Sequence, residues 1–500
     1  MPALDAHLPP GERFDASAAG SPNLSAAWAR HWRAAPDRVQ IHDPDSGWIR
    51  QGELEAESAA RAGRLAALGL SIGDRVLLSA ESSADLVLSY VACLRMGLVV
   101  IPTNTAYRPR ELEHVIRDAR PRAALIDDSQ RRAAVAALDP ALHCLEPSLD
   151  LPDGPTPRLE TAKPQSPALL CYTSGTTGQP KGAVLSHANC LASAEGLRLA
   201  WRWTEDDRLL LALPLFHMHG LGVGLHGTLA TGSSALLFRS FRPDDIITGI
   251  ERFDATLFFG VPTMYHRLAS HPDASALARL RLCVSGSAPL PPSLHEEIER
   301  VSGQRVLERY GMTETLMLVS NPYSAERRPG SVGFPLPGVD LRLEGEPAEI
   351  QVRGPNVFEG YWERGEANAE AFTADGWFRT GDLGEIDRDG YVRIVGRAKE
   401  LIISGGYNVY PREVEDVLRT HPGIEDVAVL GEPSQEWGEK VVAYAVCAKD
   451  LELDAVREFA GDRLAFYKHP RALYAVAALP RNALGKVQKH RLAKGSVLDE

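Results

Sequence analysis

The strongest constraint on the fold is an alternation of short apolar runs with amphipathic segments between Ser58 and Leu290. The apolar runs are RVLLSA, LVVIP, AALIDD, LLLALPL, SALLF, ATLFFGV and LRLCVSG. Such alternation is typical of parallel strands joined by helices, so it predicts layers of α/β structure. Ligands of parallel sheets bind beyond the carboxyl ends of the strands, and we therefore expect site loops in the Gly- and Pro-rich turns that follow these runs.

The pattern changes twice toward the C-terminus. From Val332, short extended segments separated by Gly, Pro and Asp turns predict a small β unit. After GRAK at 396–399, helical and strand-like segments alternate over a stretch compact enough for an independent α+β domain of roughly one hundred residues. We therefore expect a large N-terminal domain over residues 1–398 and a C-terminal domain over residues 399–500.

Charge and cysteine usage exclude several classes of protein. The chain of 500 residues carries a net charge of −12 and no basic stripe, which argues against a nucleic-acid partner. No basic and apolar export signal is visible at the N-terminus, and the uncharged stretch 221–238 favours a buried helix and strand over a membrane span. The cysteines form no CxxC pair, so we expect reduced thiols and a cytoplasmic location. They are Cys93, Cys144, Cys171, Cys190, Cys283 and Cys447.

The segment CYTSGTTGQPKGA, residues 171–183, combines glycines, hydroxyls and one lysine. Glycine lets the backbone approach a ligand closely, and the hydroxyls supply neutral hydrogen-bond donors. This composition predicts a phosphate-binding loop, with a flexible surface loop as the alternative. It is not the common P-loop, because Lys181 follows Pro180 and precedes Gly182.

YTSGTTGQPKG resembles the signature of the adenylate-forming superfamily, which comprises AMP-forming acyl-CoA synthetases, peptide-synthetase adenylation domains and luciferases. The later motifs of that superfamily follow in order: LPLFHMHG (213–220), YGMTET (310–315), WFRTGD (377–382), GRAKELIISGGYNVYP (396–411) and PRNALGK (480–486). The resemblance implies the adenylate-forming fold, in which the C-terminal domain is mobile.

A narrower resemblance concerns the substrate. VLERYGMTET, SNPY, GPNVFEGYW and LPRNALGKVQK are similar to segments of malonyl-CoA synthetases. This implies ATP-dependent activation of malonate or methylmalonate to an acyl adenylate with release of pyrophosphate, then transfer to CoA with release of AMP. ATP, Mg²⁺ and CoA are the implied cofactors. The alternatives are activation of another short acid, loading of a carrier-protein phosphopantetheine, a luciferase-like oxygenase and a non-catalytic nucleotide sensor.

The resemblance also implies roles for individual residues. Lys486 would bridge the carboxylate and the α-phosphate, Glu314 and Thr176 would hold Mg²⁺, and His217 would gate the acyl pocket. Asp382 would accept the ribose hydroxyls, and Tyr310 would stack on adenine. The full set of implied nucleotide-binding residues is Thr173, Ser174, Gly175, Thr176, Thr177, Lys181, Gly286, Ser287, Ala288, Glu308, Arg309, Tyr310, Gly311, Met312, Thr313, Asp382 and Arg397.

A dicarboxylate leaves a second negative charge in the acyl pocket, and burying that charge requires a cation. Arg309 is our first candidate, because its planar fork suits a carboxylate. Arg281 is a weaker candidate for which a structural role is the alternative. The remaining acyl-pocket candidates are Ser285, His217, and Met218 and Met312, which would either shorten the pocket or pack in the core.

The histidines of this region offer another interpretation. His217, His219 and His226 could form a metal site, but no Cys or carboxylate lies at a telling spacing.

The second half of the reaction concerns the C-terminal domain. By the resemblance, Lys399 is the hinge between two domain orientations, and Ser404, Gly405, Gly406 and Tyr407 line the pantetheine tunnel. Lys468 and Arg471 are candidates for the CoA phosphates, with a solvated basic face as the alternative. Acetylation of Lys486 would delete its charge, so a lysine acetyltransferase and deacetylase are possible partners.

Overall fold

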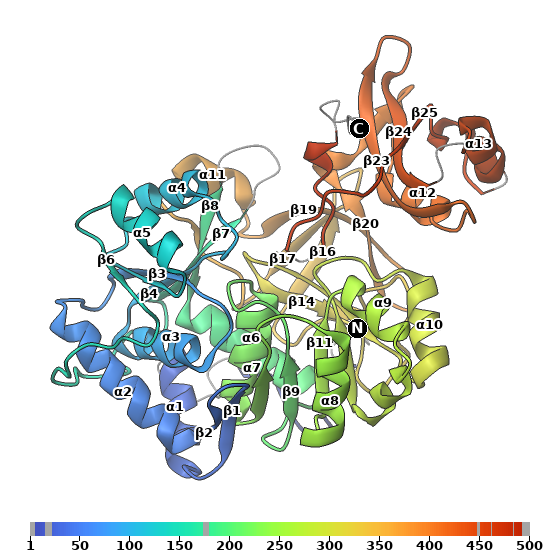
Figure 1. Cartoon of the computed structure of the whole chain (residues 1–500). Helices are drawn as coiled ribbons and strands as arrows, with labels where there is room; N and C mark the ends of the chain where they lie inside the picture. Colours follow the sequence, from blue (N-terminus) through green and yellow to red (C-terminus); the bar gives the residue numbers. More distant parts are fainter. Residues whose placement is uncertain are drawn as a thin grey trace.

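The computed structural model describes residues 6–15, 23–173, 180–447, 451–461, 463–483 and 485–492. Figure 1 shows a large body that contains the first three quarters of the chain and a smaller domain, formed by the last part, standing at one side of it.

A nine-stranded sheet lies at the centre of the large body. Its inner strands are parallel, and antiparallel strands extend it at both edges. Buried runs of β12 and its neighbours are typical of parallel strands that are covered on both faces. In spatial order the strands are β15 (Phe334–Pro335), β14 (Leu316–Ser320), β13 (Leu307–Met312), β12 (Leu282–Ser285), β11 (Leu257–Gly260), β9 (Arg208–Leu211), β10 (Ser234–Leu237), β1 (Val39–Asp43) and β2 (Gly47–Arg50).

A seven-stranded sheet forms the second half of the body. Five of its strands are parallel, and the strand over Lys181–Ser186 pairs antiparallel with the strand over Pro167–Thr173 at one side. In spatial order the strands are β18 (Gly360–Tyr361), β8 (Lys181–Ser186), β7 (Pro167–Thr173), β4 (Val99–Pro102), β3 (Arg75–Ser79), β5 (Ala123–Ile126) and β6 (His143–Leu145).

Helices fill the space between the two sheets and cover their outer faces. One continuous apolar core joins the inner faces of both sheets to the helices between them, and a separate core lies on each outer face. The inner elements are α1 (Leu24–Ala34), α2 (Gln51–Ala67), α3 (Ala84–Met96), α6 (His187–Ala200), η1 (His219–Leu225) and α7 (His226–Thr231). The outer elements are α4 (Pro109–Ala119) and α5 (Ser129–Leu138) on the seven-stranded sheet, and α8 (Pro243–Phe253), α9 (Pro262–Ala269), η2 (Ala274–Arg279) and α10 (Pro292–Ser302) on the nine-stranded sheet.

The uncharged stretch 221–238 is the buried helix and strand that its composition predicts. Residues 221–225 belong to a π-helix, α7 and β10 follow, and nearly every residue is buried. No helix among the described ranges is long and apolar enough to cross a membrane.

The predicted small β unit is a four-stranded antiparallel sheet. It lies between the body and the smaller domain, and β19 and β20 point toward the latter in Figure 1. The strands are β16 (Asp340–Glu344), β17 (Glu349–Arg353), β19 (Phe378–Ile386) and β20 (Val392–Arg397), and α11 (Gly365–Ala371) lies on the connection between β17 and β19.

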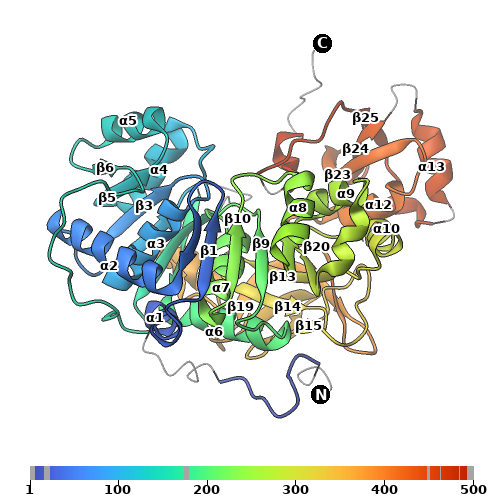
Figure 2. The same cartoon turned by 60° about the horizontal axis from the view of Figure 1, so that its bottom comes forward.

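The C-terminal domain has an α+β architecture and cores of its own. Figure 2 shows this domain beside the edge of the body that carries α9 and α10. Its elements are η3 (Ala398–Glu400), β21 (Ile402–Ser404), β22 (Tyr407–Val409), α12 (Pro411–Leu418), β23 (Ile424–Ser434), β24 (Gly438–Cys447), α13 (Leu453–Gly461), η4 (Phe466–Lys468), β25 (Ala472–Ala475) and η5 (Lys489–Arg491).

Candidate active site

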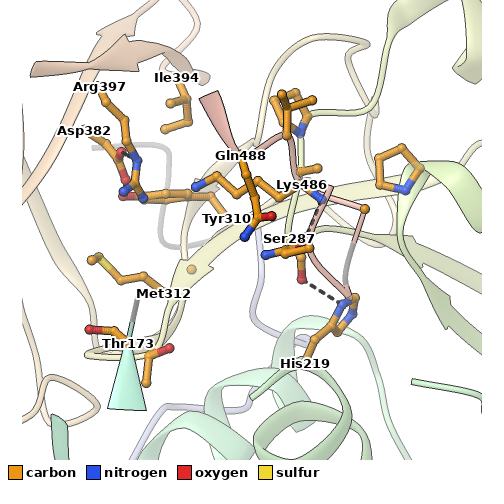
Figure 3. A pocket seen from close by; sticks show the side chains of 18 of the residues that line it. Thr173, His219, Ser287, Tyr310, Met312, Asp382, Ile394, Arg397, Lys486 and Gln488 are labelled. Carbon is orange, nitrogen blue, oxygen red and sulfur yellow. Dashed lines mark hydrogen bonds and ion pairs between the residues drawn. The ribbon is translucent and has the colours of Figure 1, made fainter. Parts of the chain in front are cut away.

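A cavity of about 2620 Å³ lies where the large body, the four-stranded sheet and the C-terminal domain meet. It opens beyond the carboxyl ends of β12 and β13, as the Sequence analysis expects for a parallel sheet. Figure 3 shows side chains from all three parts of the molecule pointing into this space. The motifs that are far apart in the chain therefore share one cavity.

Asp382 is the centre of the predicted ribose site. It lies on β19 opposite Arg397 on β20, and the Arg397 Nε forms an ion pair with its Oδ1 at 2.9 Å. The Tyr310 hydroxyl donates to the other carboxylate oxygen over 2.5 Å (Figure 3). Burial and the neighbouring carboxylate raise the pKa of Tyr310, so its hydroxyl stays a donor at neutral pH. Both carboxylate oxygens of Asp382 thus have fixed partners, and the Tyr310 ring is held at the cavity wall.

The predicted phosphate loop is described only at its two ends. Thr173 closes β7 and Lys181 opens β8, and both line the cavity. The Lys181 ammonium lies 5.4 Å from the centre of the Tyr361 ring. Ser174, Gly175, Thr176 and Thr177 lie outside the described residues, so their roles, including that of Thr176 in metal binding, stay predictions.

Glu314 is a buried carboxylate at the wall of the cavity. The Tyr361 hydroxyl donates to its Oε1 over 3.0 Å. Burial raises the pKa of Glu314, while the Tyr361 hydroxyl and Arg397 act in the opposite direction. An oxygen ligand of this kind is what Mg²⁺ prefers, and a bound cation would compensate the buried charge, so the residue fits the predicted metal role.

Lys486 reaches the same space from the C-terminal domain. Figure 3 shows its side chain extending toward Tyr310 and Arg397. The side chain is accessible from the open cavity, yet protein surrounds its ammonium. This partial desolvation and the nearby Arg397 lower the pKa of Lys486, and Asp382 acts in the opposite direction. Its ammonium is therefore held among the groups expected to bind the nucleotide.

Arg309 carries a charge at the cavity wall that no described residue compensates. It follows Glu308 on β13, is 4% exposed and lines the cavity. Its Nε and Nη2 have no hydrogen-bond partner among the described residues, and burial lowers the pKa of its guanidinium. The guanidinium packs so closely on Gly286 that a Cβ there would lie 2.3 Å from its Cζ. A buried guanidinium with two unpaired nitrogens is a ready site for an anion.

His217 and His219 lie near this guanidinium. Burial and the charge of Arg309 hold the pKa of His217 at about 4, so the ring is neutral at physiological pH. His219 Nδ1 lies 3.2 Å from the Ser287 hydroxyl (Figure 3). The His217 Nδ1 and the His219 Nε2 are buried without a partner in the described part of the chain.

The structure gives no support to the alternative histidine metal site. His226 contacts the Tyr90 hydroxyl at 2.5 Å in the core between the sheets and does not line the cavity. Within the described ranges, no group of three or more His, Cys, Asp or Glu residues could hold a metal ion.

Other predicted residues of the nucleotide and acyl sites fall into two groups. Those that line the cavity are Met218, Ser287, Ala288, Glu308, Gly311, Met312 and Thr313. Ser285 and Gly286 are buried just behind the wall. The Ser285 hydroxyl has no partner among the described residues, and Ser285 pairs in register with Glu308.

Arg281 corrects one expectation of the Sequence analysis. Its guanidinium binds Asp207 over 2.6 and 2.5 Å and donates to the Trp201 carbonyl over 3.0 Å. It does not line the cavity. Its charge is already compensated within the fold, so Arg281 holds two chain segments together and is not placed to bind the acid.

Of the predicted CoA residues, one lines the cavity and the others do not. Lys399 lines the cavity at the start of the C-terminal domain, whereas the others lie away from it. Lys468 pairs with Glu413 over 2.5 Å, and the Arg471 guanidinium lies 3.6 Å from the centre of the Trp437 ring. Ser404, Gly405, Gly406 and Tyr407 form the end of β21, a turn and the start of β22, where Tyr407 stacks on Tyr467.

Two residues of the site received no role in the nucleotide or acyl site from the sequence. Tyr361 contacts both Glu314 and Lys181, and its only signal is its place in the segment GPNVFEGYW. His219 lies against Ser287 within the segment LPLFHMHG, where His217 alone was given a catalytic role.

Family models match most of the chain. The model of the AMP-binding enzyme covers residues 28–362, and that of the AMP-binding enzyme C-terminal domain covers residues 413–486. The solved structure of ATP-bound MatB from Rhodopseudomonas palustris is 40% identical with a TM-score of 0.86, and the match covers 95% of this chain and 98% of that one. The fold class predicted from the sequence is thereby confirmed.

Curated relatives of similar identity differ in the acids they are named for. A sulfoacetate–CoA ligase of Cupriavidus necator is 37% identical over 96% of this chain and 98% of its own length. A feruloyl-CoA synthase of an Amycolatopsis species is 37% identical over 92% and 96%. A mitochondrial malonate–CoA ligase of Mus musculus is 35% identical over 92% and 88%.

Proposed function

The chain belongs to the AMP-binding enzyme family as an acyl-CoA ligase that uses ATP, Mg²⁺ and CoA, and we propose that its acid is malonate or methylmalonate. One observation carries the choice of acid. It is the Arg309 guanidinium, which is buried at the cavity wall with two nitrogens unpaired among the described residues.

A second anionic group on the acid would supply the missing partner. An unpaired buried charge is unfavourable by several kcal/mol, and a carboxylate matches the two-nitrogen fork of arginine. An acid with an apolar tail would leave this charge uncompensated. Relatives named for malonate and for sulfoacetate, whose acids both carry a second anionic end, support the proposal, whereas the relative named for ferulate does not distinguish it.

The walls near Arg309 favour a short acid. Met218 is buried, lines the cavity and contacts the Cys171 thiol at 3.9 Å. His217 and Met312 also line the cavity. These bulky side chains limit the depth available beyond the reacting carboxylate, as C3 to C4 diacids require.

In the first step, a carboxylate oxygen attacks the α-phosphorus of ATP and pyrophosphate leaves. Negative charge develops on the phosphate oxygens, and a preorganised cation stabilises it best. Lys486 is our candidate for that cation, since its ammonium lies among the nucleotide residues. Asp382 would hold the ribose and Tyr310 the adenine, each already fixed by their mutual hydrogen bond.

Glu314 would hold Mg²⁺, which neutralises phosphate charge when bound. The Tyr361 hydroxyl orients this carboxylate, and the same Tyr361 ring lies beneath the Lys181 ammonium. A single side chain thus connects the predicted metal ligand to the predicted phosphate-binding lysine.

In the second step, the CoA sulfur attacks the acyl carbon, the thiol proton is lost and AMP leaves. Lys486 occupies the cavity in the present orientation, so we propose that the C-terminal domain turns about Lys399 to admit the thiol. Ser404, Gly405, Gly406 and Tyr407 would then face the entering pantetheine. Lys468 and Arg471 are proposed for the CoA phosphates, for which Lys468 would have to leave Glu413.

A panel of acids tests the proposal. Pyrophosphate release by the purified chain is measured with ATP and CoA, comparing malonate, methylmalonate, succinate, sulfoacetate, acetate, butyrate and ferulate. We expect malonate or methylmalonate to give the highest kcat/KM and the uncharged-tail acids to be poor substrates. Equal activity on butyrate and malonate would contradict the choice of acid. Acetylation of Lys486 and a cytoplasmic location stay predictions.

A further inference from the structure

Lys486 follows a tight turn whose backbone is closely determined. The Asn482 N–H donates to the Lys486 carbonyl and the Gly485 N–H to the Asn482 carbonyl, each over 2.9 Å. The Lys486 N–H returns to the Asn482 side-chain oxygen over 2.9 Å. Arg481 and Val487 then pair as an antiparallel bridge. The position of the Lys486 backbone is therefore set by the segment that begins at Arg481.

The Arg481 guanidinium joins this turn to the sheet of the C-terminal domain. One of its nitrogens donates to the carbonyl of Gly485, the residue directly before Lys486. Another donates to the carboxylate of Asp426 on β23. Asp426 is itself held, because its Oδ1 accepts the Val427 N–H over 2.9 Å. One planar fork therefore spans from a rigid strand to the residue beside the proposed catalytic lysine.

The turn also lies close to the large body, so a small displacement would matter. Gly485 has φ +75°, and a Cβ at this position would lie 3.1 Å from the Thr263 hydroxyl of α9. Of the described residues of this turn, Arg481, Ala483 and Lys486 are exposed, so these three have little apolar packing. A shift of about 1 Å in a catalytic group can lower a rate by about 100-fold.

We propose that Arg481 is a positioning residue that places Lys486 for adenylate formation. The inference rests on the proposed role of Lys486 and does not depend on which acid is activated. Arginine is required because its fork satisfies two acceptors at once, which a lysine ammonium on a flexible stem does not reproduce. Arg481 and Asp426 are both partly solvated, with side chains 35% and 25% exposed, so the pair adds little to global stability.

The two halves of the reaction separate this role from a structural one. Adenylate formation is measured as acid-dependent pyrophosphate release, and thioester formation as conversion of the preformed acyl adenylate with CoA. The acid is whichever one the wild-type chain activates best. We expect Arg481→Met to lower the first rate by about 10- to 100-fold and to leave the second within about twofold. Lys486→Met is the reference variant. It should lower the rate of adenylate formation more than Arg481→Met does and leave thioester formation unchanged.

Four further variants complete the test. Arg481→Lys should be intermediate, and Asp426→Asn should show a smaller loss confined to the same half. Guanidinium ion at millimolar concentration should partly restore Arg481→Ala. Lys440→Met, which removes a 3.1 Å ion pair with Glu432 in the same domain, is the matched control and should change neither half.

Three results would overturn the inference. Equal losses in both halves, or no loss in Arg481→Met while Lys486→Met is impaired, would show that Arg481 does not place the lysine. If Lys486→Met itself kept normal adenylate formation, the proposed role of Lys486 would fail together with this inference. Failure of malonate as a substrate would overturn only the choice of acid. If Arg481→Met does not fold, Asp426→Asn and Arg481→Lys decide between these outcomes.

Discussion

Two arginines line the same cavity under opposite conditions. Arg397 binds the carboxylate of Asp382 over 2.9 Å, and that carboxylate in turn accepts the Tyr310 hydroxyl. Arg309 is more deeply buried, yet two of its nitrogens have no partner in the described part of the chain. The part proposed for the nucleotide therefore has its charges paired before a ligand binds, whereas the part proposed for the acid lacks a negative charge. The difference teaches that an arginine paired within the protein fixes the geometry of its neighbours, whereas an unpaired buried arginine needs a negative charge from a ligand.

The largest expected effect comes from removing the unpaired charge. Arg309→Leu should lower kcat/KM for malonate roughly 30-fold to several thousandfold, because a charge-assisted contact is lost. This corresponds to a loss of about 2 to 5 kcal/mol in transition-state stabilisation. ATP binding, measured by calorimetry, should be unchanged. The ligand-free variant should unfold at the same temperature as the wild type or higher, because an unpaired buried charge has been removed. Unchanged malonate kinetics would contradict the role given to Arg309.

Glu308, the residue before Arg309 on β13, provides a second test through the pH dependence of stability. Its Oε1 accepts the Leu290 N–H over 3.0 Å, its Oε2 has no partner in the described residues, and burial raises its pKa to about 7. The folded state thus keeps a proton that the unfolded state releases near pH 4.5. Stability should fall as pH rises from about 4.5 to about 7, by at most about 3 kcal/mol.

Glu308→Gln should remove this pH dependence. Thermal unfolding midpoints of the variant and the wild type should be similar at pH 5, and the variant should be more stable at pH 8. Glu296→Gln, on the exposed face of α10, is the control and should follow the wild type at both pH values. A wild-type midpoint that does not fall relative to that of the variant would contradict burial of a neutral Glu308.

Removing the paired arginine, Arg397, should weaken ATP binding and leave the choice of acid unchanged. Arg397→Met leaves the buried Asp382 with the Tyr310 hydroxyl alone, so we expect a loss of about 1.5 to 3 kcal/mol in binding of ATP. The preference among acids should be unchanged, which isothermal titration with ATP and the acid panel together would establish. A variant that alters the ranking of the acids would break the separation between the two ends.

The smallest effect is expected for Tyr310→Phe. The ring stays at the cavity wall, and only the hydrogen bond to Asp382 is lost. A hydrogen bond of this kind contributes about 1 kcal/mol, so the KM for ATP should rise roughly fivefold. The kcat for the acid should stay within about twofold. A large fall in kcat with unchanged KM would indicate that the hydroxyl acts in the chemical step.

Much of the fold and part of the site follow from the sequence alone. The apolar runs of seven strands identify the parallel sheets, because strands buried on both faces must be apolar along their whole length. The cysteines are free, as their spacing predicts. The motifs mark residues such as Asp382 and Lys486 because their chemistry is tied to a local pattern. The sequence left Arg281 between a structural role and the acyl pocket, because a local pattern does not show that Asp207 compensates its charge.

The sequence by itself determined the fold class and the family, and through them the kind of reaction. The reason is that the order of short motifs can be recognised before any contact between them is known. Only the tertiary structure decided which charges are compensated. Asp207 lies 74 residues from Arg281, and Asp426 lies 55 residues from Arg481, whereas Arg309 has no such partner in the described chain. Whether an arginine supports the fold or awaits a ligand depends on distant segments brought together by packing, and no local run of residues contains that information.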